Sequence, residues 1–171
     1  MNKNLSDSQN DYAVFLPSIS GFYATFIGKQ RFSEYVDYAR VPAGLNGVEG
    51  LNFLNAQQGA FEYKWALYSA GHANLDITKH VEKEDMVRKR DRDNTWLLGD
   101  SGGFQIAKGL WEGDWKDPNC PKAAIKRKLV VDWMEEYMDY GMMLDIPTWT
   151  FQDPKAAKAS GIHSYEDAVK A

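Results

Sequence analysis

The chain has little cysteine, no strong excess of charge of either sign and no long apolar run. Cys120 is the only cysteine among its 171 residues, which excludes an intrachain disulfide framework and a zinc site built from several cysteines. No segment approaches the roughly 18 consecutive apolar residues of a membrane-spanning helix, and the polar residues 1–11 contain no apolar signal-peptide core. We therefore expect a protein of a reducing, cytoplasmic setting, with no membrane partner.

Charge is nearly balanced along the chain. The 20 Lys and Arg residues against 24 Asp and Glu residues give a formal net charge of −4, so no global basic field indicates a nucleic-acid partner, and none excludes one. Basic residues gather in segments 79–92 and 122–128, but acidic residues alternate with those of the first segment, which is typical of solvated helix faces. With 44% hydrophobic residues, residues 1–171 are expected to form one globular domain.

The first part of the chain predicts two short strands and an irregular segment. Strands are expected at 12–16 and 22–27, where aromatic and β-branched residues are concentrated. A short helix is expected at 32–40. The stretch 42–59 is rich in glycine and asparagine, and we expect a structured loop there.

From residue 63 onward the pattern alternates between strands and helices. Strands are expected at 63–68 and 95–98, with a charged helix over 78–90 between them. Another buried strand is expected at 141–147, with Asp145 near its end. Repeated βα units of this kind predict a parallel sheet or barrel.

Two further helices have recognisable first residues. Pro121 suits the first turn of a helix that ends before Gly141. Its apolar residues form two i, i+4 rows on one face, which are Leu129, Trp133 and Tyr137, and Val130, Met134 and Met138. Ser164 and Asp167 resemble a capping box, with Asp in place of the usual Glu, and predict a helix that starts there.

This alternation predicts an α/β fold, the front half of a (β/α)8 TIM-type barrel with parallel strands. Because such a barrel typically needs about 250 residues, we expect the chain to be the N-terminal part of a barrel that is truncated at its C-terminus. Asp100 and Asp145 fall at the carboxyl ends of their predicted strands, where barrels collect catalytic groups. If these strands are neighbours, the two carboxylates line one pocket.

The heptapeptide Gly-Asp-Ser-Gly-Gly-Phe-Gln at 99–105 fits three classes of enzyme. A chymotrypsin-like protease would pair Ser101 with His72, but those proteases place the two residues in separate β-barrels, and the stretch between them here is predicted to be helical. An α/β-hydrolase would use Ser101 in a G-x-S-x-G elbow, followed in the right order by Asp145 and His163. No oxyanion segment of the His-Gly-Gly type precedes that elbow.

The third interpretation uses Asp100 and rests on a resemblance to a known family. Residues 100–105, Asp-Ser-Gly-Gly-Phe-Gln, resemble the signature of the tRNA-guanine transglycosylase superfamily at all six positions. Members of this superfamily exchange guanine for a 7-deazaguanine base in tRNA or, in related phage and bacterial enzymes, in DNA. Met143-Leu-Asp145 followed by Pro147 is similar to the family's next acidic strand end, and the turn with His72 is placed like a histidine-containing turn in those enzymes.

The resemblance implies a division of labour between the two carboxylates. Asp100 would be the general acid/base, and Asp145 would accept hydrogen bonds from N1–H and the exocyclic amine of the purine. Phe104 would stack on the base, and the glycines would let the backbone approach it. The substrate-binding residues implied are Ser101, Gly102, Gly103, Phe104, Gln105, Asp145 and His72.

Structural roles are the alternative for these residues. Asp100 would cap the following helix, Asp145 would be a turn residue before Pro147, and Phe104 would belong to the core. Three tryptophans near the strand ends, Trp111, Trp115 and Trp149, are candidates for a platform that binds bases or nucleic acid, and they too have packing as their alternative.

The family's nucleophilic aspartate and its cysteine/histidine zinc site lie beyond the position that matches Ala171. The resemblance thus implies no cofactor or metal in this chain, and a chain that is incomplete for catalysis unless a second chain supplies the rest of the barrel. The implied partners are a 7-deazaguanine base and a nucleic acid. The short, aromatic-rich chain favours a phage-type enzyme acting on DNA, in the host cytoplasm, over a tRNA enzyme. A non-catalytic remnant is the non-enzyme alternative.

Overall fold

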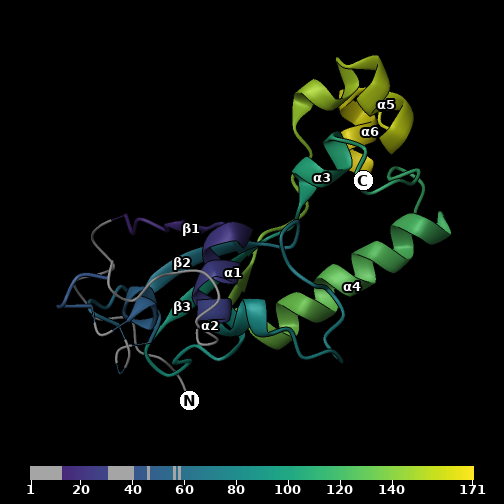
Figure 1. Ribbon diagram of the computed structural model, residues 1–171. Coiled ribbons are helices and arrows are strands. Elements are labelled where there is room, and N and C mark those ends of the chain that lie inside the picture. The colour runs from purple at the N-terminus through teal and green to yellow at the C-terminus, as the bar shows by residue number, and fades with distance from the viewer. Residues whose placement is uncertain (1–12, 31–40, 46, 56, 58) are drawn as a thin grey trace.

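The computed structural model describes residues 13–30, 41–45, 47–55, 57 and 59–171. Its fold is α/β, as predicted, with one sheet of four parallel strands (Figure 1). The strands lie side by side in chain order and are β1 (Ser18–Ile19), β2 (Trp65–Ser69), β3 (Trp96–Asp100) and β4 (Tyr140–Gly141). Within these ranges β1 and β4 form the two edges, and the sheet is open. The helix predicted over 32–40 lies outside the described residues.

Helices connect the successive parallel strands. α1 (Gly21–Gln30) follows β1, and the 3-10 turn η3 (Val48–Leu51) precedes β2. Between β2 and β3 lie η4 (Glu82–Glu84) and α2 (Asp85–Arg88), and between β3 and β4 lie α3 (Gly103–Ala107) and α4 (Pro121–Tyr137). After β4 come η5 (Thr148–Phe151), α5 (Pro154–Ser160) and α6 (Tyr165–Lys170). No helix in this described part of the chain has the length and apolar character that crossing a membrane requires.

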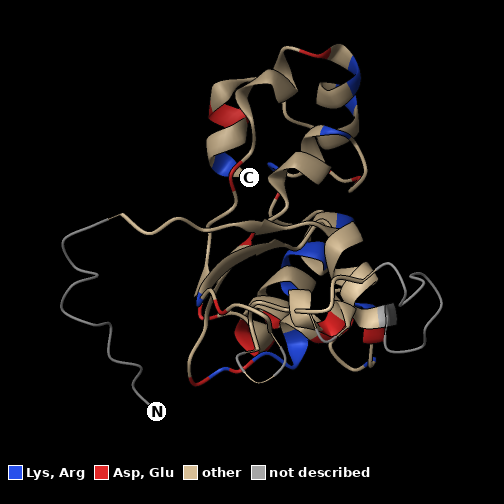
Figure 2. Cartoon of the chain, turned by 60° about the vertical axis from the view of Figure 1, so that its left-hand side comes forward, with Lys and Arg blue, Asp and Glu red and all other residues tan. Residues whose placement is uncertain are grey.

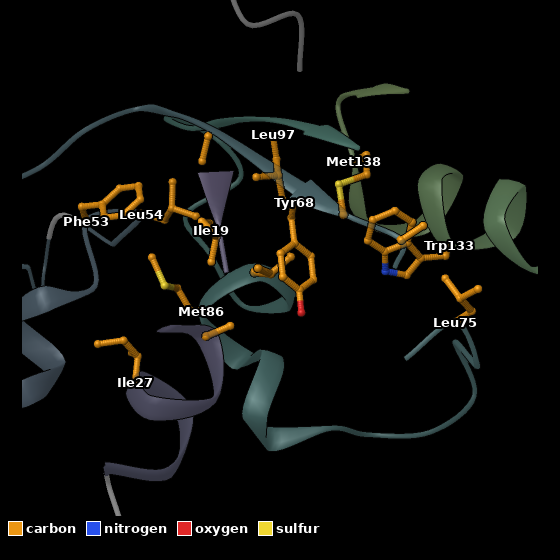
Figure 3. Close-up of a cluster of buried hydrophobic side chains, with 14 of the residues drawn as sticks. Ile19, Ile27, Phe53, Leu54, Tyr68, Leu75, Met86, Leu97, Trp133 and Met138 are labelled. Carbon is orange, nitrogen blue, oxygen red and sulfur yellow. The ribbon is translucent and has the colours of Figure 1, made fainter. Parts of the chain in front are cut away.

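The main core lies between the sheet and helices α1, α2 and α4 (Figure 3). Tyr68 of β2 and Leu97 of β3 are buried there against Met86 of α2 and Trp133 of α4. Gly99 leaves room for α4, because a Cβ at this position would be 2.8 Å from Met138 Cγ. The residues on one face of each central strand therefore pack against the helices.

The other face of the sheet is formed by the alternate strand residues. Because successive side chains point to opposite faces, three registered pairs of β2 and β3 share this second face, Trp65 with Trp96, Leu67 with Leu98, and Ser69 with Asp100. The two tryptophan rings stack with 4.7 Å between their centroids. Apolar residues on both faces are typical of parallel sheets, and Asp100 lies at the carboxyl end of the second face.

A smaller cluster joins α3, the first turn of α4 and residues after β4, beyond the carboxyl end of the sheet, where α3 and α6 lie (Figure 1). Its buried members are Ile106, Trp115, Ala123, Ile146 and Ile162. The segment that leaves β4 therefore passes from the sheet into a second packed group of helices.

The capping predicted at Ser164 is confirmed in a slightly altered form. Ser164 Oγ accepts the N–H of Asp167 at 3.2 Å, and α6 starts at Tyr165, directly after Ser164. The Asp167 carboxylate accepts the N–H of His163 at 3.0 Å instead of the N–H of Ser164. Asp is one methylene shorter than the Glu of a standard capping box.

The strand predicted at 22–27 is wrong, because this segment belongs to α1. Ser20 caps the helix, with its Oγ accepting the N–H of Tyr23 at 3.0 Å, and Ala24 and Ile27, three positions apart, are buried. The aromatic residues favoured a strand, whereas the cap and the i, i+3 spacing decide for a helix. The strand predicted at 12–16 is also wrong over its described residues, since the ladder begins only at Pro17, whose carbonyl accepts the N–H of Leu67.

The charged helix predicted over 78–90 is reduced to η4 and α2. Residues before them are held in turns, because Asp76 Oδ1 accepts both the N–H of Thr78, at 3.1 Å, and its hydroxyl, at 2.6 Å. The hydrogen bond from the Thr78 hydroxyl, followed by that from Lys79, lowers the pKa of Asp76 to about 2, and the Thr78 N–H contributes less. Side chains that bond to the nearby backbone in this way compete with helix formation.

The strand predicted at 141–147 is limited to β4. Met142 N–H still donates to Gly99 O at 2.9 Å, but β3 ends at Asp100, so residues 143–147 pair with no strand among the described residues and Asp145 lies beyond β4. The strands predicted at 63–68 and 95–98 are confirmed as β2 and β3, each shifted by one or two residues. The helix predicted from Pro121 is confirmed as α4, and Val130, Trp133 and Met138 from its two apolar rows are buried in the main core.

Candidate functional site at the ends of β3 and β4

The chain reverses direction directly after β3. Asp100 is the last residue of that strand and is half-buried. Its Oδ1 accepts the N–H of Gly102 at 3.4 Å. Gly102 has a φ of 82° and stands immediately before α3, a backbone conformation that favours glycine. Asp100 is thus held at the carboxyl edge of the sheet by its own turn.

The segment that carries Asp145 lies against this turn. The N–H of Asp145 donates to Ser101 Oγ at 3.4 Å. The carbonyl oxygen of Asp145 is so close to Gly103 that a Cβ atom there would be 1.7 Å from it. Ser101 and Gly103 are buried, whereas Asp145 is exposed. The structure therefore brings together the two acidic segments at one edge, through backbone contacts that only a glycine at 103 permits.

Gln105 connects this turn with the turn that follows β2. Its side chain is 8% exposed and covers Gly71, where a Cβ atom would be 2.0 Å from the amide carbon and nitrogen. A Cβ at Gly102 would be 3.3 Å from Gln105 Oε1. That oxygen is buried and has no hydrogen-bond partner among the residues that the structure describes. Since buried polar atoms normally have partners, this oxygen is an unsatisfied acceptor beneath the signature turn.

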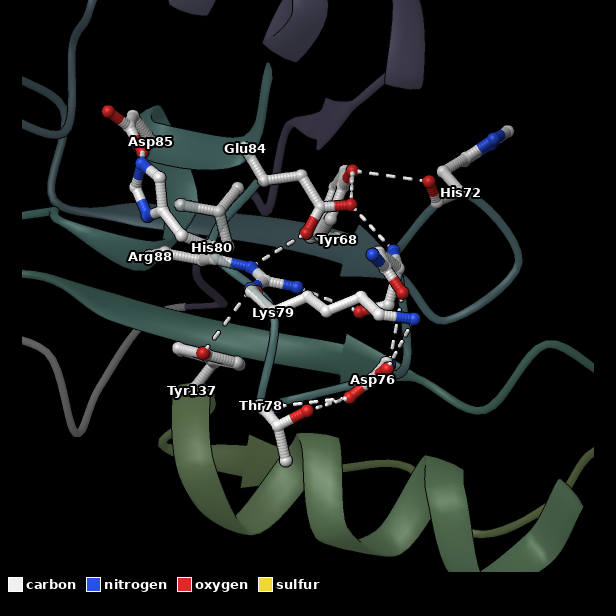
Figure 4. Close-up of polar contacts among 12 residues, drawn as sticks. Tyr68, His72, Asp76, Thr78, Lys79, His80, Glu84, Asp85, Arg88 and Tyr137 are labelled. Atoms are coloured by element: carbon white, nitrogen blue, oxygen red, sulfur yellow. Dashed lines mark hydrogen bonds and ion pairs between the residues drawn. The ribbon is translucent and has the colours of Figure 1, made fainter. Parts of the chain in front are cut away.

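His72 lies at the same edge of the sheet but is turned toward α1. The residue is exposed, and a Cβ at Gly21 would be 3.5 Å from its Nδ1. Its carbonyl accepts the hydroxyl of Tyr68 at 3.5 Å, while its ring points away from that contact (Figure 4). No hydrogen bond joins His72 to residues 100–105 in the described part of the chain. The structure therefore groups His72 less closely with the signature than it groups Asp145.

A buried ion pair between Glu84 and Arg88 holds the loop after β2 (Figure 4). One carboxylate oxygen of Glu84 accepts the N–H of Asn74 at 2.7 Å and the Tyr68 hydroxyl at 3.5 Å, and the other accepts Arg88 Nε at 2.8 Å. Arg88 also donates to the carbonyls of Asn74 and Lys79. Burial, together with the charge of Glu84, raises the pKa of Tyr68, so its phenol stays protonated.

The sequence analysis missed this pair because it assigned the charges near residue 84 to a solvated helix face. Glu84 is 1% exposed. The i, i+4 spacing of Glu84 and Arg88 was the available signal, but spacing alone does not reveal burial.

Phe104 lies on the surface beside the signature turn. It is 53% exposed, so the alternative of a core residue is excluded. Its ring meets Trp149 edge to face, with 6.0 Å between the centroids. Of the other two tryptophans that were candidates for a platform, Trp115 is buried in the smaller cluster, and Trp111 stacks on it at 6.4 Å.

Neither Asp100 nor Asp145 lines either of two apolar cavities of the described structure. An apolar cavity of about 250 Å³ lies between α4 and residues 142–144 and reaches Ser101, but neither Asp100 nor Asp145 lines it. A cavity of about 460 Å³ is lined by Phe15, Tyr23 and other apolar residues near β1. The two carboxylates therefore belong to neither of these cavities.

The described residues of this site form no metal-binding cluster, and no known relative gives a comparison for it. Within the described ranges, no group of three or more His, Cys, Asp or Glu residues could hold a metal ion. Comparison with protein-family models, curated proteins and solved structures finds no match.

Proposed function

We propose that this chain is the N-terminal half of a (β/α)8 barrel of the tRNA-guanine transglycosylase type. In this proposal it takes part in exchanging guanine for a 7-deazaguanine base in a nucleic acid. The observation that carries the proposal is the contact between Asp145 and the turn formed by Ser101 and Gly103. Two sequence motifs that resemble that family, far apart in the chain, meet at the sheet edge where α/β enzymes place their chemistry.

The arrangement of strands and helices supports the barrel half of the proposal. Each described strand pairs with the next strand in the chain, and helices α1, α2 and α4 pack on the same face. A doubly wound sheet would instead reverse its strand order and carry helices on both faces. The second face, with Trp65, Leu67 and Leu98, would then line the inside of the barrel.

Asp100 and Asp145 would perform different tasks in the reaction. Base exchange needs a carboxylate nucleophile at the ribosyl carbon and a group that moves protons to and from the two bases. We assign the proton transfer to Asp100, and the recognition of N1–H and the exocyclic amine to the exposed Asp145. Phe104 supplies an aromatic surface for the base. The nucleophile would come from the rest of the barrel, as part of a longer or companion chain.

Ser101 is better placed to support the site than to act as a nucleophile. Its side chain is 4% exposed, and its hydroxyl accepts the N–H of Asp145. No hydrogen bond joins it to a histidine within the described residues. The serine-hydrolase alternative requires that an active-site serine probe label the chain and that Ser101→Ala abolish the labelling.

Calorimetric binding of free guanine and 7-cyano-7-deazaguanine tests the proposal. Asp145→Asn replaces an acceptor by a side chain that also donates, and we expect it to weaken binding at least about tenfold, since hydrogen bonds to charged groups are the strong ones. Asp132→Asn, on the surface of α4, is the matched control and keeps the affinity of the wild type. Absence of binding by a folded wild-type chain contradicts the proposal.

Exchange assays on DNA and on tRNA distinguish the two substrates. Our proposal favours DNA, and the tRNA reaction is the second form of the same chemistry. Incorporation of labelled base into tRNA alone, by the chain together with the remainder of its barrel, would select the tRNA form.

A further inference from the structure

A group of two aromatic rings and one cation lies beside the signature turn, with Phe104 and Lys108 exposed and Trp149 partly buried. Phe104 belongs to α3, Lys108 follows that helix directly, and Trp149 belongs to η5. The planes of the two rings are inclined by 72°, with 6.0 Å between their centroids. Lys108 Nζ lies 5.6 Å from the Phe104 centroid and 5.1 Å from that of Trp149. The ammonium group is therefore near both rings.

Lys108 and Lys126 have aromatic partners, whereas several other lysines of the described structure pair with carboxylates. Lysine and arginine positions are spread over the helices together with acidic positions (Figure 2). Lys89, Lys122 and Lys128 each pair with a carboxylate within 3.1 Å. Lys108 forms no ion pair with a carboxylate of the described residues, and its charge meets only the two rings. Its charge is thus available to an anion, and a nucleic acid brings such an anion with every phosphate.

We propose that Trp149 and Lys108 bind the nucleotide next to the target nucleotide, in a single strand that is kinked between the two. This inference rests on the proposed function, in which Phe104 takes the target base. Stacking on aromatic rings together with contacts to a positive charge is the usual means of binding single strands.

The inclination of the rings specifies the shape of the strand. Bases that stack on Phe104 and on Trp149 would lie at a steep angle to each other, because the ring planes differ by 72°. Successive bases of a duplex are parallel and stacked, so a regular duplex does not fit both rings. An extruded target nucleotide has lost this stacking. Lys108, close to both rings, is positioned for the phosphate that joins the two nucleotides.

Fluorescence anisotropy with a labelled, guanine-containing DNA oligonucleotide tests the inference, with the matching duplex as comparison. We expect the wild type to prefer the single strand. Trp149→Leu should weaken binding of the single strand about tenfold at every salt concentration, because a stacking surface is lost. Lys108→Gln should weaken binding and reduce the slope of log affinity against log salt by about 0.7. Lys155→Gln, an exposed lysine of α5, is the control and leaves binding unchanged.

Trp149→Phe covers the case in which the leucine variant does not fold. It keeps a smaller ring, and we expect its affinity to lie between those of the wild type and Trp149→Leu. Equal binding of the single strand by wild type, Trp149→Phe and Lys108→Gln overturns the inference, and so does equal affinity for duplex and single strand or no binding of either.

Free-base calorimetry on wild type and Asp145→Asn decides the proposed function separately. If base binding depends on Asp145 but the Trp149 and Lys108 variants bind the oligonucleotide like the wild type, the proposed function is supported and this inference is contradicted. If the Trp149 and Lys108 variants bind the oligonucleotide more weakly but the chain does not bind the free base, the chain has a site for single strands and the proposed base exchange is contradicted.

Discussion

At the scale of single residues, contact between the two acidic segments depends on the absence of a side chain at Gly103. The carbonyl of Asp145 occupies the space that a Cβ would need. Gly71 is required in the same way by the side chain of Gln105. The glycines of this site therefore act by admitting neighbouring chain segments, and only Gly102 is needed for its positive φ.

Gly103→Ala is predicted to separate the two segments. Its Cβ would lie 1.7 Å from Asp145 O, so the backbone must shift, which costs about 1–3 kcal/mol in a packed site. Urea denaturation measures this loss, and guanine binding should be lost with it. Gly44→Ala is the control, because nothing lies within 4 Å of a Cβ there and its φ is not positive. Equal stability of the two variants would contradict the close approach of the Asp145 carbonyl to Gly103.

At the scale of elements, the long loop between β2 and β3 is held by side chains. Glu84 and Arg88 provide partners for the backbone of Asn74 and Lys79, so the turns replace the helix that the charge pattern predicts. The loop carries His72 and contacts Gln105 through Gly71. The position of this loop therefore affects the site although Glu84 and Arg88 do not reach it.

Glu84→Gln is predicted to destabilise the fold strongly. It leaves the Arg88 charge buried without its carboxylate, and breaking a buried pair by removing one partner costs about 3–5 kcal/mol. Asp132→Asn breaks the more exposed pair with Lys128 on α4 and is expected to cost less than about 1 kcal/mol. Urea denaturation of both variants is the measurement. Similar losses in the two would mean that Glu84 is not effectively buried.

At the scale of the whole molecule, two apolar clusters of different size share one chain. The larger cluster joins the sheet to α1, α2 and α4, whereas the smaller one joins α3, the first turn of α4 and residues after β4. α6 contributes no buried residue. Local stability follows the number of buried apolar contacts, so the two parts should differ in how readily they open.

Hydrogen–deuterium exchange is predicted to show this difference. Backbone amides of β2 and β3 should exchange with the global unfolding of the chain, and those of α6 at least about a hundredfold faster, through local opening. Amides in the middle of α4, which packs on the larger cluster, are the internal reference for a protected helix. Protection of α6 equal to that of β3 would show that both clusters unfold as one unit.

Local patterns were sufficient for the elements whose own residues decide their structure. β2, β3, α4 and the cap at Ser164 follow from apolar spacing, Pro121 and side-chain capping, which act within a few residues. α1 was mistaken for a strand because its aromatic content outweighed the weaker signal of Ser20. The length of β4 could not be predicted, since it depends on where its neighbour β3 ends.

The amino-acid sequence by itself determined the α/β class, the two central strands, the long helix and the placement of Asp100 at a strand end, because hydrophobic periodicity and turn residues are local properties. Only the tertiary structure decided that Asp145 lies against Ser101 and Gly103, that Glu84 is buried, and that Phe104 and Trp149 meet beside Lys108. These contacts join residues that are distant in the chain or lie on different elements. The contact of Asp145 with the signature turn exists because parallel pairing brings the carboxyl ends of successive strands to one edge, and Glu84 is buried because the β2–β3 loop folds over it.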